Sequence, residues 1–317
     1  MEFGTPRPVF DDLKLKYNPT GEWIFPSVVD ASVLSSAAPA RWHLYYSPHD
    51  GPGGICLAYA DNLLGPWVEY DRNPIISNEW APHYRVSHVA SPHALWIEEE
   101  GKLFLWFHGE NDVTHYASSA DGIHFDYEGA AVSTADFDNS TECSYGRVFR
   151  HRLPSRDSRY VILLMGSVEG RCVIHLGWSP DARSWSTLRR PLIVVPEALG
   201  GHGASAWLYR DEDGPKLVYH SGRGLPVGFR GDPRIFDLLG DFCVVRVSED
   251  LEPRGGHQVL HRAREGYPDF GRVCDFALVH DDRGEAVVFY VAGKRLQGRL
   301  FFMPARAGEA ELVKPPG

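Results

Sequence analysis

Short apolar stretches, each running directly into a polar loop, recur along the chain. Five of them stand out, at residues 42–46, 102–107, 159–165, 216–219 and 286–291. Their aromatic and β-branched side chains favour strands, and no helical period is obvious in the sequence. The pattern predicts a protein built from many short β-strands. None of the stretches is long enough to span a membrane.

Each apolar stretch belongs to a larger repeating unit. A further strand is predicted before each one, at residues 30–34, 93–97, 145–150, 205–209 and 275–280. Turns such as Ser119-Ala120-Asp121-Gly122 and Ser179-Pro180-Asp181 follow. Asp favours turns because its side chain hydrogen-bonds to nearby backbone, and Gly favours them because it adopts positive φ without steric cost. The unit is therefore strand, strand, polar loop, strand, aspartate turn, strand.

Five such units predict an all-β fold, a single five-bladed β-propeller over residues 1–317 with four antiparallel strands per blade. One unit cannot bury its two faces alone, whereas radial packing buries them and leaves only short edges. The expected blades cover approximately 24–80, 86–135, 142–197, 202–262 and 270–314. A pair of β-sandwiches also has many short strands and is the alternative, but the fivefold recurrence favours the propeller.

Two details of the ring are also predicted. The last unit holds four strands of its own, ending near residues 311–313, so ring closure does not need the N-terminal segment. An insertion rich in Gly, Pro, Arg and Asp at residues 224–241 is a candidate lid or rim loop.

Composition and charge narrow the classes of partner. The chain has 42 acidic and 32 basic residues, so its net charge of −10 argues against nucleic acid. Five cysteines, an odd number without a Cys-x-x-Cys pair, argue against a disulfide framework or a zinc ribbon. No signal peptide is recognisable, so we expect a cytoplasmic protein, or a secreted one if a leader has been removed. No membrane partner is expected, and the oligomeric state stays open.

The propeller geometry predicts where ionisable side chains gather. The first strand of every blade lines the central channel, and the loop after the second strand returns to the end where the first strand starts. We call this end the mouth. Near the strand starts lie Asp30, His88, His93, Glu142, Tyr145, His202, Arg272 and Asp275, and the loops contribute His49, Asp50, Glu110 and Arg223. Ionisable groups from several units at one channel end indicate a functional site, although a wet channel also tolerates polar residues.

Several motifs resemble glycoside hydrolase family 43 and its five-bladed relatives. Asp30-Ala31-Ser32-Val33-Leu34 followed by His43-Leu44-Tyr45-Tyr46-Ser47 is similar to their first blade, where the pattern is Asp-Pro-Ser-Val-Val and then a tyrosine-rich strand. Ser91-Pro92-His93-Ala94-Leu95-Trp96 resembles their second blade. The turn Ala58-Tyr59-Ala60-Asp61 with Gly65-Pro66-Trp67 after it is also typical of the group.

The resemblance implies glycoside cleavage by carboxylates. In the family a blade-one Asp is the general base, a blade-three Glu is the general acid, and a blade-two Asp tunes the acid. It thus implies Asp30 as the base and Glu142 as the acid, although the family's Glu-Gly-Pro context is absent. The blade-two position holds His93, so a histidine takes part in the expected catalytic set. Such chemistry needs one protonated and one ionised carboxyl group.

The sequence thus predicts a glycoside hydrolase-like enzyme acting on a small glycoside or oligosaccharide. The expected catalytic residues are Asp30, Glu142 and His93, and the expected substrate-binding residues are His49, Asp50, His88, Glu110, Tyr145, His202, Arg223, Arg272 and Asp275. No cofactor is required, and a single Ca²⁺ in the central channel is compatible with the chain. Two alternatives stay open: a lyase, transferase or phosphorylase that uses His and Arg, and a non-catalytic carbohydrate-binding propeller.

Overall fold

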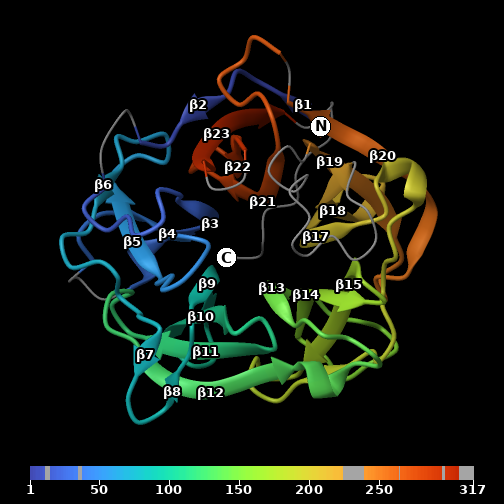
Figure 1. Ribbon diagram of the computed structural model, residues 1–317, viewed down its shortest axis with the longest axis horizontal. Helices are drawn as coiled ribbons and strands as arrows, with labels where there is room; N and C mark the ends of the chain where they lie inside the picture. The colour runs from blue at the N-terminus through green and yellow to red at the C-terminus, as the bar shows by residue number, and fades with distance from the viewer. Residues whose placement is uncertain (11–14, 35–37, 224–238, 264, 295–296, 307–317) are drawn as a thin grey trace.

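The chain folds into five antiparallel sheets arranged in a ring (Figure 1). This computed structural model describes residues 1–10, 15–34, 38–223, 239–263, 265–294 and 297–306. The predicted all-β, five-bladed β-propeller is confirmed. Within those ranges no helix is long and apolar enough to cross a membrane.

Four of the blades are sheets of four strands that run outward from the channel. Blade one holds β3 (Ile24–Asp30), β4 (Trp42–Ser47), β5 (Cys56–Ala60) and β6 (Val68–Glu69). Blade two holds β9 (Val89–Ile97), β10 (Lys102–Gly109), β11 (Val113–Ser119) and β12 (Asp126–Ser133). Blade three holds β13 (Ser144–Arg150), β14 (Tyr160–Val168), β15 (Arg171–Ser179) and β16 (Ser186–Thr187). Blade four holds β17 (Gly203–Asp211), β18 (Gly214–Arg223), β19 (Leu239–Val247) and β20 (Pro253–Arg262).

Smaller elements lie between the blades and within blade one. A hairpin of β7 (Glu79–Trp80) and β8 (Tyr84–Arg85) connects blades one and two. The 3-10 helices among the described residues are η1 (Ala31–Val33), which lies inside blade one between β3 and β4, η2 (Thr134–Asp136), which follows blade two, and η3 (Glu197–Leu199), which follows blade three. The predicted insertion of blade four falls mostly on residues 224–238, which lie outside the described residues.

The fifth blade corrects the prediction about ring closure. Its own strands are β21 (Val273–His280), β22 (Ala286–Ala292) and β23 (Arg299–Arg306). The outermost places beside β23 are taken by β1 (Glu2–Phe3) and β2 (Arg7–Pro8). The N-terminal segment thus closes the ring through main-chain pairing, and the prediction that it is not needed was wrong. The fourth strand predicted near 311–313 lies outside the described residues.

The blades are joined by layers of apolar side chains. Along β10, Leu103, Leu105 and Phe107 pack in the cluster shared with blade one. Phe104 and Trp106 pack in the cluster shared with blade three. This alternation follows from the two-residue period of a strand, and it explains why the inner strands read as nearly continuous apolar runs.

One irregularity recurs near the start of every innermost strand. A non-glycine residue adopts positive φ beside a shift in strand register, and the five residues are Phe25 (62°), Ser91 (57°), Tyr145 (55°), Ser205 (48°) and Asp275 (58°). Left-handed backbone is uncommon for residues other than glycine, and bulges often occur beside functional sites. These five equivalent positions therefore mark the mouth end of each blade.

Candidate active site

The mouth is the end of the ring at which the five innermost strands start. β3, β9, β13, β17 and β21 lie nearest the centre of the ring in Figure 1. In blade one, Ile24 pairs with Ser47, so the loop after β4 returns to the start of β3. The same reversal occurs in the other blades. We call the opposite end of the ring the far face.

A hydrogen-bonded triad spans the mouth from blade three to blade one. The Tyr145 hydroxyl lies 3.2 Å from His49 Nε2, and His49 Nδ1 lies 2.7 Å from Asp50 Oδ1. Because a carboxylate oxygen only accepts, Nδ1 of His49 carries the proton and Nε2 accepts from the tyrosine hydroxyl. The sequence placed all three residues at the mouth, and the structure brings them into contact.

Two aromatic rings fix the orientation of Tyr145. Phe25 meets the Tyr145 ring edge to face, with centroids 4.9 Å apart and an interplanar angle of 74°. His108 stacks on it at 5.5 Å and 26°. Burial lowers the pKa of His108, so this ring is neutral and packs as an aromatic group. Neither neighbour was predictable from the sequence, since neither an apolar residue nor a histidine inside a strand carries a distinctive signal.

The loop residues of blade two are held by local hydrogen bonds. His88 Nε2 lies 3.2 Å from Asn111 Oδ1. The Glu110 carboxylate accepts from the backbone N–H and the hydroxyl of Ser87, and these bonds keep the pKa of Glu110 below its usual value. The predicted substrate-binding residue Glu110 therefore shapes the rim through Ser87.

His93 lies deeper than a mouth residue. Its Nε2 donates to the carbonyl oxygen of Val148 over 2.7 Å, and its ring meets Trp207 edge-on. Burial, helped by the charge of Arg147, lowers the pKa of His93 to about 3. The neutral, buried imidazole of His93 links blades two and three through this hydrogen bond. Such a structural contact does not favour the predicted catalytic role of His93.

Arg147 is a buried cation that the sequence analysis did not single out. It is 1% exposed, and its Nη1 donates to Ser91 Oγ and to the Pro92 carbonyl oxygen, each over 3.2 Å. Its Nε and Nη2 donate to no acceptor among the described residues. Burial lowers the pKa of Arg147, and the carboxylate of Asp275 opposes that effect. An arginine directly before Val148 and Phe149 in β13 was the available signal.

Blade five contributes an acid and a second arginine, and blade four holds two hydrogen-bonding partners of that acid residue. Asp275 is 2% exposed and accepts from the Ser205 hydroxyl, while its backbone N–H donates to His220 Nδ1 over 3.3 Å. Burial lowers the pKa of His220 to about 4, so this histidine is a neutral acceptor. Arg272 lies 3.8 Å from Glu22, a buried acid at the start of blade one.

The predicted general base is at the wrong end of the ring. Asp30 is the last residue of β3, where it accepts from the backbone N–H of Ser32 and from Arg41 Nη2 over 2.7 Å. Six residues at about 3.3 Å each separate it from the strand start by roughly 20 Å. Burial alone would raise the pKa of Asp30, but the bonds from Arg41 and Ser32 outweigh burial and lower it. Asp30 thus caps η1 on the far face.

Asp30 was predicted at the strand start because the family pattern was matched to residues too far along the chain. The family pattern Asp-Pro-Ser-Val-Val coincides with Phe25-Pro26-Ser27-Val28-Val29, which lies at the start of β3 and carries the positive-φ residue. The aspartate position of the pattern is therefore Phe25. Phe25, His93 and Tyr145 lie near the starts of the innermost strands of blades one, two and three, and none of them is a carboxylate.

The remaining predicted residues lie around this centre. Glu142 precedes β13, is 6% exposed, and its carbonyl oxygen accepts from the Ser140 hydroxyl. His202 is 3% exposed, and its Nδ1 accepts from the backbone N–H of Cys172 over 3.2 Å. Arg223 is the last residue of β18. Over the described part of the chain, no group of three or more His, Cys, Asp or Glu side chains is arranged to hold a metal ion.

Comparison with known proteins places the fold among glycoside hydrolases. No protein-family model matches the sequence, and no curated protein sequence matches it. Among solved structures, one described as a glycoside hydrolase is 13% identical over 93% of this chain and 90% of its own, with a TM-score of 0.66. An exo-1,5-α-L-arabinanase from a bovine ruminal metagenomic library is 11% identical over 93% and 97%, with a TM-score of 0.63.

A third similar structure is a Bombyx mori GH32 β-fructofuranosidase. It is 17% identical over 88% of this chain, which spans 56% of its length, with a TM-score of 0.60. The resemblance to five-bladed propeller glycosidases that the motifs indicated is thus confirmed for the fold. Identities of this size establish shared architecture, so the reaction has to be argued from the mouth.

Proposed function

We propose that the chain is a carbohydrate-active enzyme that cleaves a glycosidic bond at the mouth, with Tyr145 as the reacting side chain. The observation that carries the proposal is the Tyr145–His49–Asp50 triad. A nucleophile within hydrogen-bond reach of a base, which a third group orients, is the general arrangement of covalent catalysis. The shared fold supports a carbohydrate as the substrate class by analogy.

In the proposed reaction His49 takes the hydroxyl proton of Tyr145, and Asp50 stabilises the resulting imidazolium. The phenolate oxygen attacks the anomeric carbon, the glycosidic C–O bond breaks, and the leaving oxygen takes the proton from His49. Water, deprotonated by His49, then displaces the tyrosine and restores its hydroxyl. Two displacements at one carbon retain the anomeric configuration.

The test compares Tyr145→Phe with the wild-type protein on aryl arabinofuranosides, xylosides, galactosides and fucosides. Turnover that is lost in Tyr145→Phe and kept in Asp30→Asn supports the proposal, and the anomer first released reports retention. Turnover that survives Tyr145→Phe but disappears in Glu142→Gln would return the reaction to a carboxylate mechanism and overturn the role of Tyr145.

A sugar-binding propeller without turnover is the second candidate. It is favoured by Phe25, His93 and Tyr145, which lie near the starts of the innermost strands of the first three blades and carry no carboxylate. This candidate predicts saturable binding of sugars by calorimetry, no product from any glycoside of the panel, and no change of that result in Glu142→Gln.

A further inference from the structure

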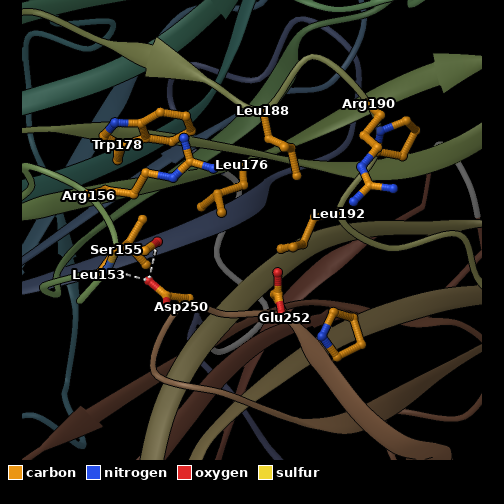
Figure 2. Close-up of a pocket in the computed structure, with 12 residues that line it drawn as sticks. Leu153, Ser155, Arg156, Leu176, Trp178, Leu188, Arg190, Leu192, Asp250 and Glu252 are labelled. Carbon is orange, nitrogen blue, oxygen red and sulfur yellow. Dashed lines mark hydrogen bonds between the residues drawn. The ribbon is translucent and has the colours of Figure 1, made fainter.

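A hollow opens on the far face, between blades three and four (Figure 2). Its volume is about 410 Å³. Three segments of blade three and the β19–β20 turn of blade four enclose it, and we call it the far-face groove. Its lining residues are Leu153, Ser155, Arg156, Leu176, Trp178, Leu188, Arg190, Pro191, Leu192, Asp250, Glu252 and Pro253.

The floor of the groove is apolar although it faces solvent. Leu176, Leu188 and Leu192 lie in its middle in Figure 2, and Trp178 lies at one side. Leu188, Leu192 and Trp178 are only half-buried, so the blades leave this surface partly uncovered. A floor of this kind offers contact to the C–H face of a small ligand.

Charged groups stand around that floor. The guanidinium of Arg156 lies over the Trp178 ring, 4.3 Å from its centroid. Asp250 Oδ1 accepts from the backbone N–H of Ser155 over 2.9 Å and from its hydroxyl over 2.8 Å. Both side chains are therefore held in place at one side of the groove.

At the other positions Arg190 and Glu252 face the groove. No salt bridge within 4.0 Å joins Arg156 to Asp250 or Arg190 to Glu252. The groove thus presents two guanidinium groups and two carboxylates that are not joined in these pairs, although the hydrogen bonds from Ser155 and the charge of Arg156 lower the pKa of Asp250. Their charges balance, so neither an anion nor a cation is favoured over a neutral ligand.

We propose that the far-face groove binds a short neutral saccharide. A sugar hydroxyl both donates and accepts hydrogen bonds, so it can bridge a guanidinium and a carboxylate that do not reach each other. The C–H faces of the sugar would pack on the leucines and the edge of Trp178. The volume lies within the roughly 300–1,000 Å³ of small-molecule sites, which suits one or two sugar units. The proposal does not depend on the reaction at the mouth.

The experiment titrates the full chain with neutral mono- and disaccharides of glucose, galactose, xylose and arabinose, followed by calorimetry and tryptophan fluorescence. We expect saturable binding, with a fluorescence change that Trp178→Phe removes. Arg190→Ala and Glu252→Ala should each weaken binding and raise the dissociation constant at least tenfold. The matched control Arg189→Ala alters the neighbouring residue, which pairs with Asp138 outside the groove, and should change it less than twofold.

Three results would overturn the proposal. The first is the absence of saturable binding for every sugar of the panel. The second is binding that Tyr145→Phe removes and the groove variants leave intact, which would assign the sugar to the mouth alone. The third is a concentration-dependent dimer in sedimentation that Arg190→Ala dissociates, which would assign the groove to a second copy. Thermal unfolding of each variant establishes that it is folded.

Discussion

Two sets of charged side chains, one at each end of the propeller, differ in burial. On the far face Asp30, Arg41 and Asp282 form a network in which every side chain is a third or more exposed. At the mouth Arg147 and Asp275 are at most 2% exposed, and part of the Arg147 guanidinium has no acceptor among the described residues. Exposed ion pairs contribute little free energy, whereas buried, half-satisfied polar groups destabilise a fold. The mouth therefore has the arrangement expected of a site kept for function.

The largest expected effect is a loss of activity from a substitution at the mouth, compared with one on the far face. Tyr145→Phe removes the hydroxyl that His49 faces, so we expect kcat/KM to fall about 10²–10⁴-fold, the usual contribution of a positioned proton-transfer group. Asp30→Asn changes only the far face and should leave kcat/KM within about threefold. Steady-state kinetics on the same glycoside check both. Equal losses in the two variants would contradict the comparison.

Acid should unfold the protein through its buried histidines. Burial lowers the pKa of His43 and of His175 to about 4, below the ordinary value of about 6.5. The unfolded chain then binds more protons, so stability is complete above pH 6.5 and falls as the pH drops toward 4. Each such histidine lowers the free energy of unfolding by about 3 kcal/mol once it is fully protonated. Urea unfolding from pH 7.5 to 4 measures the slope.

A pair of variants sharpens that measurement. His43→Gln removes one titrating group and should flatten the slope of unfolding free energy against pH by up to one proton. Asn62→Gln changes an exposed amide that does not titrate and should leave the slope as it is. An unchanged slope in His43→Gln would mean that the acid sensitivity arises elsewhere.

Removing the N-terminal strands tests the pairing of β1 and β2 with β23, which closes the ring. Deleting residues 2–8 uncovers the edge of β23, which β1 and β2 cover. We expect a loss of about 3 kcal/mol, from roughly 1 kcal/mol for each of a few main-chain hydrogen bonds. Urea unfolding at pH 7.5 measures it. A midpoint equal to that of the wild type would show that the edge needs no cover.

The smallest effect is expected on the far face. Arg41→Met removes the cation shared by Asp30 and Asp282, and the exposed pairs should cost about 1 kcal/mol or less. Arg72→Met, at another exposed arginine, is the control and should cost still less. A loss of several kcal/mol in Arg41→Met would contradict the contrast drawn between this exposed network and the buried Arg147 and Asp275.

The repeat was readable in the sequence because each blade needs the same local pattern. The apolar second strands begin and end near the predicted bounds, as β10 does at Lys102–Gly109. The first strand of blade one was predicted too late in the chain because Asp30-Ala31-Ser32-Val33-Leu34 resembles the start of a strand. In the structure Asp30 ends β3, and the residues after it form η1. The strands β1 and β2 have two residues each, too few to show alternation.

The site was predictable as a region but not as a set of contacts. His49 and Tyr145 are 96 residues apart, and the topology alone placed them at one mouth. Which of the gathered side chains would meet depends on the bulge at Tyr145 and on the packing of Phe25 and His108 against its ring. Neither feature has a sequence signal of its own. The signal that was available was the shared Pro of Phe25-Pro26-Ser27 and Ser91-Pro92-His93, which aligns the two strand starts.

The five positive-φ residues make the scaffold open to redesign. Since Phe25, Ser91, Tyr145, Ser205 and Asp275 occupy equivalent backbone positions, a side chain exchanged at one of them changes the lining of the same end of the ring. Left-handed backbone costs an ordinary residue about 1–2 kcal/mol, and glycine or asparagine less, so most exchanges start from an already strained position. Tyr145 is the one of the five that is partly exposed, so a library randomised at its codon would sample new chemistries with the least disturbance of the core.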